Sequence, residues 1–278
     1  MGSGSADNGQ RFRKNTWQMT QDDNLASMIA TNLAEVKDRI SGPGQTVLVA
    51  VSKRQPDERI DACLAAGHRV FGENRVQEAQ QRWGPRRPHY PDLKLHLIGP
   101  LQTNKAADAV ALFDVIEVVD RPKLAKILAE EMRRQDRYLP CYIQVNTGEE
   151  PQKSGVMPAD LDDFVAYCRD QCALQNEGLM CIPPADEEPA MHFALLRDMA
   201  RRHNISGLSM GMSADYEDAI AFGATSIRVG SAIFGERDQE PYELDLFLVM
   251  GVQTHSKVPH SKLLRSKAPD SRMTHSNF

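Results

Sequence analysis

Short apolar segments alternate with longer amphipathic ones from about residue 24 to residue 229, and this alternation constrains the fold of the chain most. Strictly alternating β and α elements favour a parallel sheet. About eight such units in about 210 residues predict an α/β fold, a single (β/α)8 TIM-type barrel. An open doubly wound sheet would usually carry a glycine-rich fingerprint after its first strand, and none stands there. We expect strands over 46–53, 70–73, 93–99, 115–119, 139–146, 178–182, 205–210 and 225–229, and helices over 24–40, 57–66, 76–83, 105–113, 122–134, 158–172, 188–203 and 215–222.

The two ends of the chain fall outside this pattern. Residues 1–20 are predicted to be a disordered N-terminal segment, because its first ten residues are rich in Gly, Ser, Asp and Asn. The barrel is expected over residues 21–237. Residues 238–278 are predicted to form an atypical tail, partly disordered, since its end is rich in Ser, His, Lys and Pro. Three irregularly spaced histidines in this tail predict no metal site.

The composition excludes several classes of protein. Hydrophobic residues make up 41% of the 278 residues, enough for a substantial core, and the net charge of −5 argues against a nucleic-acid partner. No apolar run approaches membrane-spanning length, and the N-terminus lacks the apolar core of a secretory signal. The 5 cysteines are scattered without a CxxC pair. We therefore expect a cytoplasmic protein with buried, reduced thiols, no metal ligands and no membrane partner.

Lys53 ends the first predicted strand. The run from Thr46 to Lys53 is apolar and β-branched, as in a strand buried on both faces. An unpaired buried charge is costly, so a lysine in this place needs a reason. At the carboxyl end of a barrel strand it would project into the region where such folds keep their chemistry. The alternative is that Lys53 simply begins a solvated loop.

The segments after strands seven and eight are small, glycine-interrupted and hydroxyl-bearing. They are Gly207–Ser213 and Arg228–Gly235. Phosphate commonly binds after these two strands of a barrel, where backbone N–H groups can approach an anion. Ordinary turns are the alternative for either segment alone. Arg228 lies within the last strand and can only donate hydrogen bonds, so it requires an acceptor such as a phosphate oxygen or a ring nitrogen. A lysine, a phosphate cup and an arginine are together the parts that hold pyridoxal 5′-phosphate (PLP).

Several segments resemble the signature segments of the YggS/PROSC family of PLP homeostasis proteins. The resemblance extends over about residues 24–237, with the segments in one order. They are Val49-Ala50-Val51-Ser52-Lys53, Phe71-Gly72-Glu73-Asn74-Arg75-Val76-Gln77-Glu78, the run from His96 to Lys105, Gln144-Val145-Asn146, Lys153-Ser154-Gly155-Val156, Gly178-Leu179-Met180, the run from Leu208 to Ser213, and Arg228-Val229-Gly230 through Phe234-Gly235.

This resemblance implies a single PLP-binding barrel similar to the N-terminal domain of alanine racemase. It implies that Lys53 carries the vitamin B6 cofactor PLP as a Schiff base, that Asn74 lies near it and that Arg228 faces the ring. It further implies that the phosphate is surrounded by Ser209, Met210, Ser213, Gly230 and Ser231. Members of the family are regarded as homeostasis proteins without an established turnover, so no catalytic residue is expected.

Three functions fit these residues. The first is a PLP carrier or sensor, the second a PLP-dependent amino-acid racemase-like enzyme, and the third a barrel enzyme acting on a phosphorylated metabolite. The racemase takes its second acid/base group from an additional β domain for which this chain has no room. We therefore favour the carrier, expected to be a monomer, whose partners would be PLP-dependent apoenzymes or PLP-synthesising enzymes.

Four more polar residues have two interpretations each. His96 either contacts the cofactor or satisfies a hydrogen bond in the core. Glu73 and Glu78 could act as acid/base groups, but salt bridges to Arg75 or to lysines are favoured. Lys105 is either a surface charge beside a helix or a second lysine that handles PLP.

Overall fold

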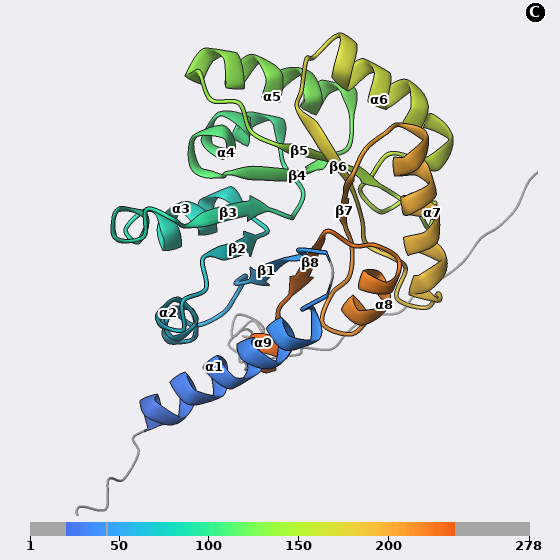
Figure 1. Ribbon diagram of the computed structural model, residues 1–278. Coiled ribbons are helices and arrows are strands. Elements are labelled where there is room, and N and C mark those ends of the chain that lie inside the picture. Colours follow the sequence, from blue (N-terminus) through green and yellow to red (C-terminus); the bar gives the residue numbers. More distant parts are fainter. Residues whose placement is uncertain (1–20, 43, 237–278) are drawn as a thin grey trace, which may run out of the picture. The chain divides into compact units, whose positions relative to one another are not determined.

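A computed structural model describes residues 21–42 and 44–236 of the chain and has the predicted (β/α)8 architecture (Figure 1). Eight parallel strands close in sequence order into a barrel, with β1 paired to both β2 and β8. The predicted disordered segments, 1–20 and 238–278, lie outside the described residues. The strands are β1 (Val47–Val51), β2 (Val70–Glu73), β3 (Lys94–Leu97), β4 (Val115–Val119), β5 (Cys141–Val145), β6 (Asn176–Cys181), β7 (Gly207–Ser209) and β8 (Ser226–Val229).

Helices surround the strands (Figure 1). The first of them, α1, packs against the last, α9, where Asn32 Nδ2 donates a hydrogen bond of 3.0 Å to the Ile233 carbonyl. The helices are α1 (Gln21–Arg39), α2 (Asp57–Ala65), α3 (Val76–Trp83), α4 (Ala106–Leu112), α5 (Pro122–Gln135), α6 (Leu161–Asp170), α7 (Pro189–Arg202), α8 (Tyr216–Ala221) and α9 (Ser231–Phe234), with 3-10 turns at Arg87–His89, Thr103–Lys105 and Pro158–Asp160.

Helix α5 shows how the sequence produces these elements. Leu124, Leu128 and Met132 recur at four-residue spacing and are buried against the barrel. Pro122 occupies the first turn, where its missing N–H leaves no hydrogen bond unmade. Asp136 ends the helix in the left-handed conformation, at φ 49°.

The strands bury different residues on their two faces. Leu48 and Ala50 of β1 belong to the apolar layer between barrel and helices. Val49 alternates with them and is also buried, so it faces the barrel interior, where a Cβ placed on Gly72 of the neighbouring strand would lie 2.8 Å from Val49 Cγ1. All 5 cysteines of the chain are buried and free of disulfides. Burial raises the pKa of Cys63 and Cys181 to about 12.

The observed elements are mostly shorter than the sequence predicts. The first strand ends at Val51 rather than at residue 53, and the third ends at Leu97 rather than at 99. Ser52 and Ile98 are buried like strand residues, so burial alone does not distinguish them from residues in the ladder. Helix α9 was not predicted, since its glycine-flanked segment has the composition of a loop. No helix within residues 21–42 and 44–236 combines the length and the apolar character needed to cross a membrane.

Candidate functional site

Lys53 lies in a tight turn just beyond the end of β1. It is half-buried, and the turn is closed by a hydrogen bond of 3.1 Å from the Gln55 N–H to the Ser52 carbonyl. Arg54 has a φ of 56°, which is the left-handed region that a non-glycine residue enters at a cost. The lysine therefore stands at the carboxyl end of a barrel strand, on a turn whose backbone is strained.

Arg228 of β8 is buried, with only 4% of its surface exposed. Its Nη1 donates to Ser209 Oγ at 2.6 Å, and its Nη2 donates to the Cys181 carbonyl at 2.8 Å. The guanidinium is thus held by β6 and β7. The sequence predicted that an arginine in this strand would need an acceptor, and the protein itself supplies two.

A chain of hydrogen bonds runs from Arg228 to Ser209, from Ser209 to Glu117 of β4, and from Glu117 to His96. The Ser209 hydroxyl donates to Glu117 Oε2 at 2.5 Å, and His96 Nδ1 lies 2.6 Å from Glu117 Oε1. Because β4 and β7 are not neighbours in the closed barrel, the bond between Ser209 and Glu117 crosses its interior. His96 therefore makes the interior hydrogen bond that was one of its two interpretations.

The carboxylate of Glu117 is fully buried but carries a lowered pKa. Burial by itself would raise this pKa, yet the hydrogen bond and charge of His96, the charge of Arg228 and the Ser209 hydroxyl together outweigh it. Sequence reasoning missed Glu117. The available signal was a carboxylate inside the apolar strand 115–119, the same kind of signal that singled out Arg228.

The loops that follow β7 and β8 meet at Ser213. Its Oγ accepts hydrogen bonds from the backbone N–H groups of Gly230, at 3.1 Å, and of Ala232, at 3.4 Å. Ser231 is the first residue of α9, so these N–H groups lie at the start of that helix. Ser213 and Ala232 also line a cavity of about 430 Å³ between α1 and these loops. The structure thus brings together Ser213, Gly230 and Ser231.

Ser209 and Met210 have different surroundings. The Ser209 hydroxyl is occupied by Arg228 and Glu117 inside the barrel. The side chain of Met210 is fully buried in the apolar layer, and its N–H donates to the Ser226 carbonyl at 3.1 Å. Their place beside a phosphate stays a prediction.

Asn74 and Lys105 line one cavity of about 500 Å³. It lies over the segments that follow β2 and β3, and it is lined by Asn74, Arg75, Val76, Gln77, Pro100, Leu101, Gln102 and Lys105. Lys105 lies 3.8 Å from Asp108 in a loose ion pair. Both interpretations of this lysine therefore stay open.

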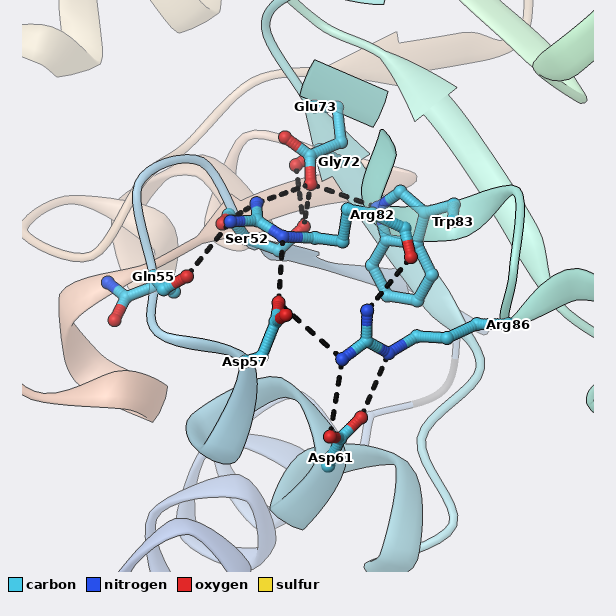
Figure 2. Close-up of polar contacts among 9 residues, drawn as sticks. All are labelled: Ser52, Gln55, Asp57, Asp61, Gly72, Glu73, Arg82, Trp83 and Arg86. Atoms are coloured by element: carbon cyan, nitrogen blue, oxygen red, sulfur yellow. Dashed lines mark hydrogen bonds and ion pairs between the residues drawn. The ribbon is translucent and has the colours of Figure 1, made fainter. Parts of the chain in front are cut away.

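The two glutamates beside Asn74 have different partners. Arg75 pairs with Glu78 at 3.5 Å, as predicted. Glu73 instead contacts Arg82 of α3 at 3.0 Å, and it also accepts a hydrogen bond from Ser52 (Figure 2). The predicted pairing of Glu73 with Arg75 or a lysine is therefore wrong, because Glu73 is fully buried whereas Arg75 is exposed.

Comparisons with known proteins identify the family of this chain. A sequence model for the alanine racemase N-terminal domain matches residues 26–238. The chain is 38% identical over 231 residues to the pyridoxal phosphate homeostasis protein of Escherichia coli, covering 76% of this chain and 97% of that protein. It is 40% identical over 227 residues to the protein of the same name from Pseudomonas aeruginosa, with the same coverage of 76% and 97%.

Solved structures show the same relationship. PipY of Synechococcus elongatus, determined without PLP, has a TM-score of 0.70 and 39% identity, covering 74% of this chain and 100% of that one. PipY with PLP bound has a TM-score of 0.67 and 37% identity over the same shares. An alanine racemase from Corynebacterium glutamicum, at 19% identity and a TM-score of 0.56, shares the fold alone. Sequence and structure together establish that this chain belongs to the pyridoxal phosphate homeostasis protein family, with an alanine racemase N-terminal-type barrel.

Proposed function

We propose that this protein holds PLP through a covalent link to Lys53 and passes the cofactor on to other proteins, without useful turnover of amino acids. The observation that carries the proposal is the position of Lys53 just beyond the carboxyl end of β1, the strand that pairs with β8, which bears Arg228. The relatives named as PLP homeostasis proteins and the PipY structure with PLP bound support it.

The donor set fits this cofactor. PLP requires a primary amine for its aldehyde, several donors for a dianionic phosphate and a polar group for its ring nitrogen. Lys53 is the amine. The Ser213 hydroxyl accepts hydrogen bonds from the N–H groups of Gly230 and Ala232, which leaves its own proton for a phosphate oxygen, and it brings the loops after β7 and β8 together where barrels commonly bind phosphate.

Arg228 would donate a hydrogen bond to the ring nitrogen of PLP. It uses Nη1 and Nη2 for Ser209 and the Cys181 carbonyl, and a guanidinium has five N–H donors in all, so donors are left over. A guanidinium can donate but does not give up its proton at neutral pH, so it leaves the ring nitrogen unprotonated. That weakens the ring as an electron sink, which is why we favour holding over turnover.

The chemistry of attachment is a single condensation. The neutral Lys53 amine would form a C=N bond with the aldehyde of PLP, its two hydrogens leaving with the carbonyl oxygen as water, so the step would need no oxidant or metal. Hydrolysis by the same route in reverse returns free PLP. Reversibility is what a carrier needs. Its recipients would be apoenzymes that use PLP, and its sources would be enzymes that make it.

Borohydride reduction followed by peptide mapping tests the attachment. PLP-loaded protein should yield one reduced adduct at Lys53, and Lys53→Ala should lose both this adduct and the visible absorption of the linked cofactor. A matched variant, Lys105→Ala, should keep both. An adduct at Lys105 instead would show that the lysine is misassigned.

Deuterium exchange at Cα of alanine in heavy water separates the carrier from a racemase-like enzyme. We expect exchange no faster than that caused by free PLP, together with transfer of PLP to an added apoenzyme. Exchange well above free PLP that disappears in Lys53→Ala would refute the carrier and support the enzyme.

A further inference from the structure

Behind the turn that carries Lys53, a buried carboxylate collects three hydrogen bonds (Figure 2). Glu73 ends β2 and has no exposed surface. Its Oε1 accepts from Ser52 Oγ at 2.7 Å, from Arg82 Nη1 at 3.0 Å and from Trp83 Nε1 at 2.9 Å. Two of these donors come from α3 and the third is the residue directly before Lys53.

Arg82 holds the same turn by its backbone. Its Nη1 donates to the Ser52 carbonyl at 2.7 Å, and its Nη2 donates to the Gln55 carbonyl at 2.9 Å. These two carbonyls flank Lys53 and Arg54, so one planar guanidinium spans the turn from end to end. A guanidinium can make two such bonds at once with fixed geometry, which an ammonium cannot.

Apolar packing alone would not require this arrangement. A buried carboxylate is costly even when paired, and apolar residues of similar volume often replace such a pair without loss of stability. In addition, Glu73 Oε2 is buried without a hydrogen-bond partner among the residues that the structure describes. A buried polar atom left unsatisfied calls for a reason other than stability. The left-handed φ of Arg54 points the same way, since strained turns persist only where their surroundings hold them.

We propose that Glu73 and Arg82 are positioning residues for Lys53: they fix the turn so that the lysine amine stands at the barrel mouth, ready to link to PLP. This inference rests on the proposed attachment of PLP to Lys53. Glu73 and Arg82 lie behind the turn, between the barrel and α3, so they act through the backbone of residues 52–55.

Two acidic residues of α2 lie beside Arg82 and Arg86. Asp57 Oδ1, at the start of α2, lies 3.5 Å from Arg82 Nε and 3.5 Å from Arg86 Nη2. Arg86 also bonds to Asp61 of α2 at 2.9 Å (Figure 2). Arg86 thereby joins α2 to α3 without a hydrogen bond to residues 52–55, and this makes it a natural control for Arg82.

The experiment compares two cofactor forms. Pyridoxamine 5′-phosphate has the same ring and phosphate as PLP but an amine in place of the aldehyde, so it cannot link to a lysine. Arg82→Lys keeps the charge but cannot bond both carbonyls. We expect Arg82→Lys to bind PLP about tenfold more weakly or worse, the size of one lost charge-assisted hydrogen bond. It should bind pyridoxamine 5′-phosphate as wild type does, and Arg86→Lys should match wild type with both ligands.

Borohydride trapping at saturating PLP gives a second readout. The fraction of bound PLP that is trapped on Lys53 should fall in Arg82→Lys and stay at the wild-type level in Arg86→Lys. If Arg82→Lys does not fold, Trp83→Phe takes its place, because it removes the donor to Glu73 while keeping a smaller aromatic ring against Phe71, 4.6 Å away between centroids. Its losses should have the same direction and a smaller size.

Two outcomes overturn the positioning role. One is an equal loss of affinity for both cofactor forms, which would mean that the cluster supports the whole site. The other is unchanged PLP affinity and trapping in a folded variant. Neither depends on whether the attachment itself holds, because wild-type protein without any trapped Lys53 adduct would instead refute the proposed function.

Discussion

Val49 of β1 and Arg228 of β8 are directly paired residues in the barrel wall. Paired residues of adjacent parallel strands point their side chains to the same face, and Val49 faces the interior. Lys53 follows four residues after Val49, in the turn beyond the end of β1. The backbone of Arg228 therefore lies deeper along the barrel wall than the backbone of Lys53, and a ligand that contacts both side chains would extend along β1 and β8.

Removing Arg228 should destabilise the protein strongly. Arg228→Met would remove the hydrogen bonds to Ser209 and to the Cys181 carbonyl and the nearby charge that helps lower the pKa of Glu117, and losing the partner of a buried charge typically costs about 3–5 kcal/mol of unfolding free energy. Urea unfolding of the protein without PLP measures this loss. The double variant Arg228→Met with Glu117→Gln should recover part of it. Additive losses in the double variant would show that the two side chains are not coupled.

Phosphate should dominate the affinity for the cofactor. A hydrogen bond to a charged group contributes about 1.5–3 kcal/mol. Pyridoxal lacks the phosphate and therefore loses several such bonds, so its affinity should be lower than that of PLP by orders of magnitude. Competition titrations with inorganic phosphate should raise the apparent Kd of PLP, whereas chloride at equal ionic strength should have a smaller effect. Equal affinities for pyridoxal and PLP would rule out a phosphate cup at Ser213 and Gly230.

The acid stability of the fold should depend on His68. Burial lowers its pKa from 6.5 to about 4, and its Nε2 lies 2.8 Å from the Val70 carbonyl. Between these pH values the unfolded chain binds a proton that the folded protein does not bind. Stability is therefore full above the unfolded pKa and falls as the pH falls toward 4, by an amount on the order of 3 kcal/mol.

Urea unfolding at several pH values checks this. His68→Gln should flatten the decline between pH 6.5 and 4. His203→Gln changes a histidine whose Nε2 lies 2.8 Å from Asp162 at the surface, and it should keep the decline. An unchanged slope in His68→Gln would assign the acid sensitivity to other groups.

Two glycines allow backbone strain to be separated from steric overlap. Gly211 and Gly223 have φ values of 95° and 92°. A Cβ on Gly211 would lie 2.6 Å from Ala219 Cβ, whereas nothing lies within 4 Å at Gly223. Gly223→Ala should cost about 1–2 kcal/mol from the left-handed backbone alone. Gly211→Ala should cost a further 1–3 kcal/mol or so from overpacking and should also weaken PLP binding, since Gly211 leads into Ser213. Thermal unfolding and PLP titration measure both, and equal losses would contradict the overlap.

The sequence predicted those features for which a pattern or a residue type has a single physical explanation. Alternating elements predicted the barrel, because a parallel sheet buries both faces of its strands. Arg228 was noticed because a cation inside an apolar strand requires an acceptor. The same reasoning would have singled out Glu117 as a buried carboxylate that needs donors. It would not have identified those donors, because the residues of the network come from β3, β4, β7 and β8, and the register of these strands is set by the closed barrel.

No comparable feature of the sequence indicated that Glu73 and Arg82 support the turn that carries Lys53. Arg82 lies on an ordinary amphipathic helix, and nothing in its spacing links it to the carbonyls of residues 52 and 55. Glu73 was expected to pair with Arg75, two residues away, but alternate residues of a strand share a face only while the strand continues, and β2 ends at Glu73. Partners of this kind depend on how helix and barrel pack, which local sequence does not specify.

The buried cysteines allow transient opening of the barrel to be measured by thiol labelling. Each thiol is enclosed, and those of Cys63 and Cys181 would deprotonate only near pH 12, so a thiol reagent added at neutral pH meets almost no thiolate in the folded protein. Labelling then proceeds only through molecules that have transiently opened. The labelling rate of each cysteine would therefore report local opening around α2, β5, α6 and β6, without any engineered probe.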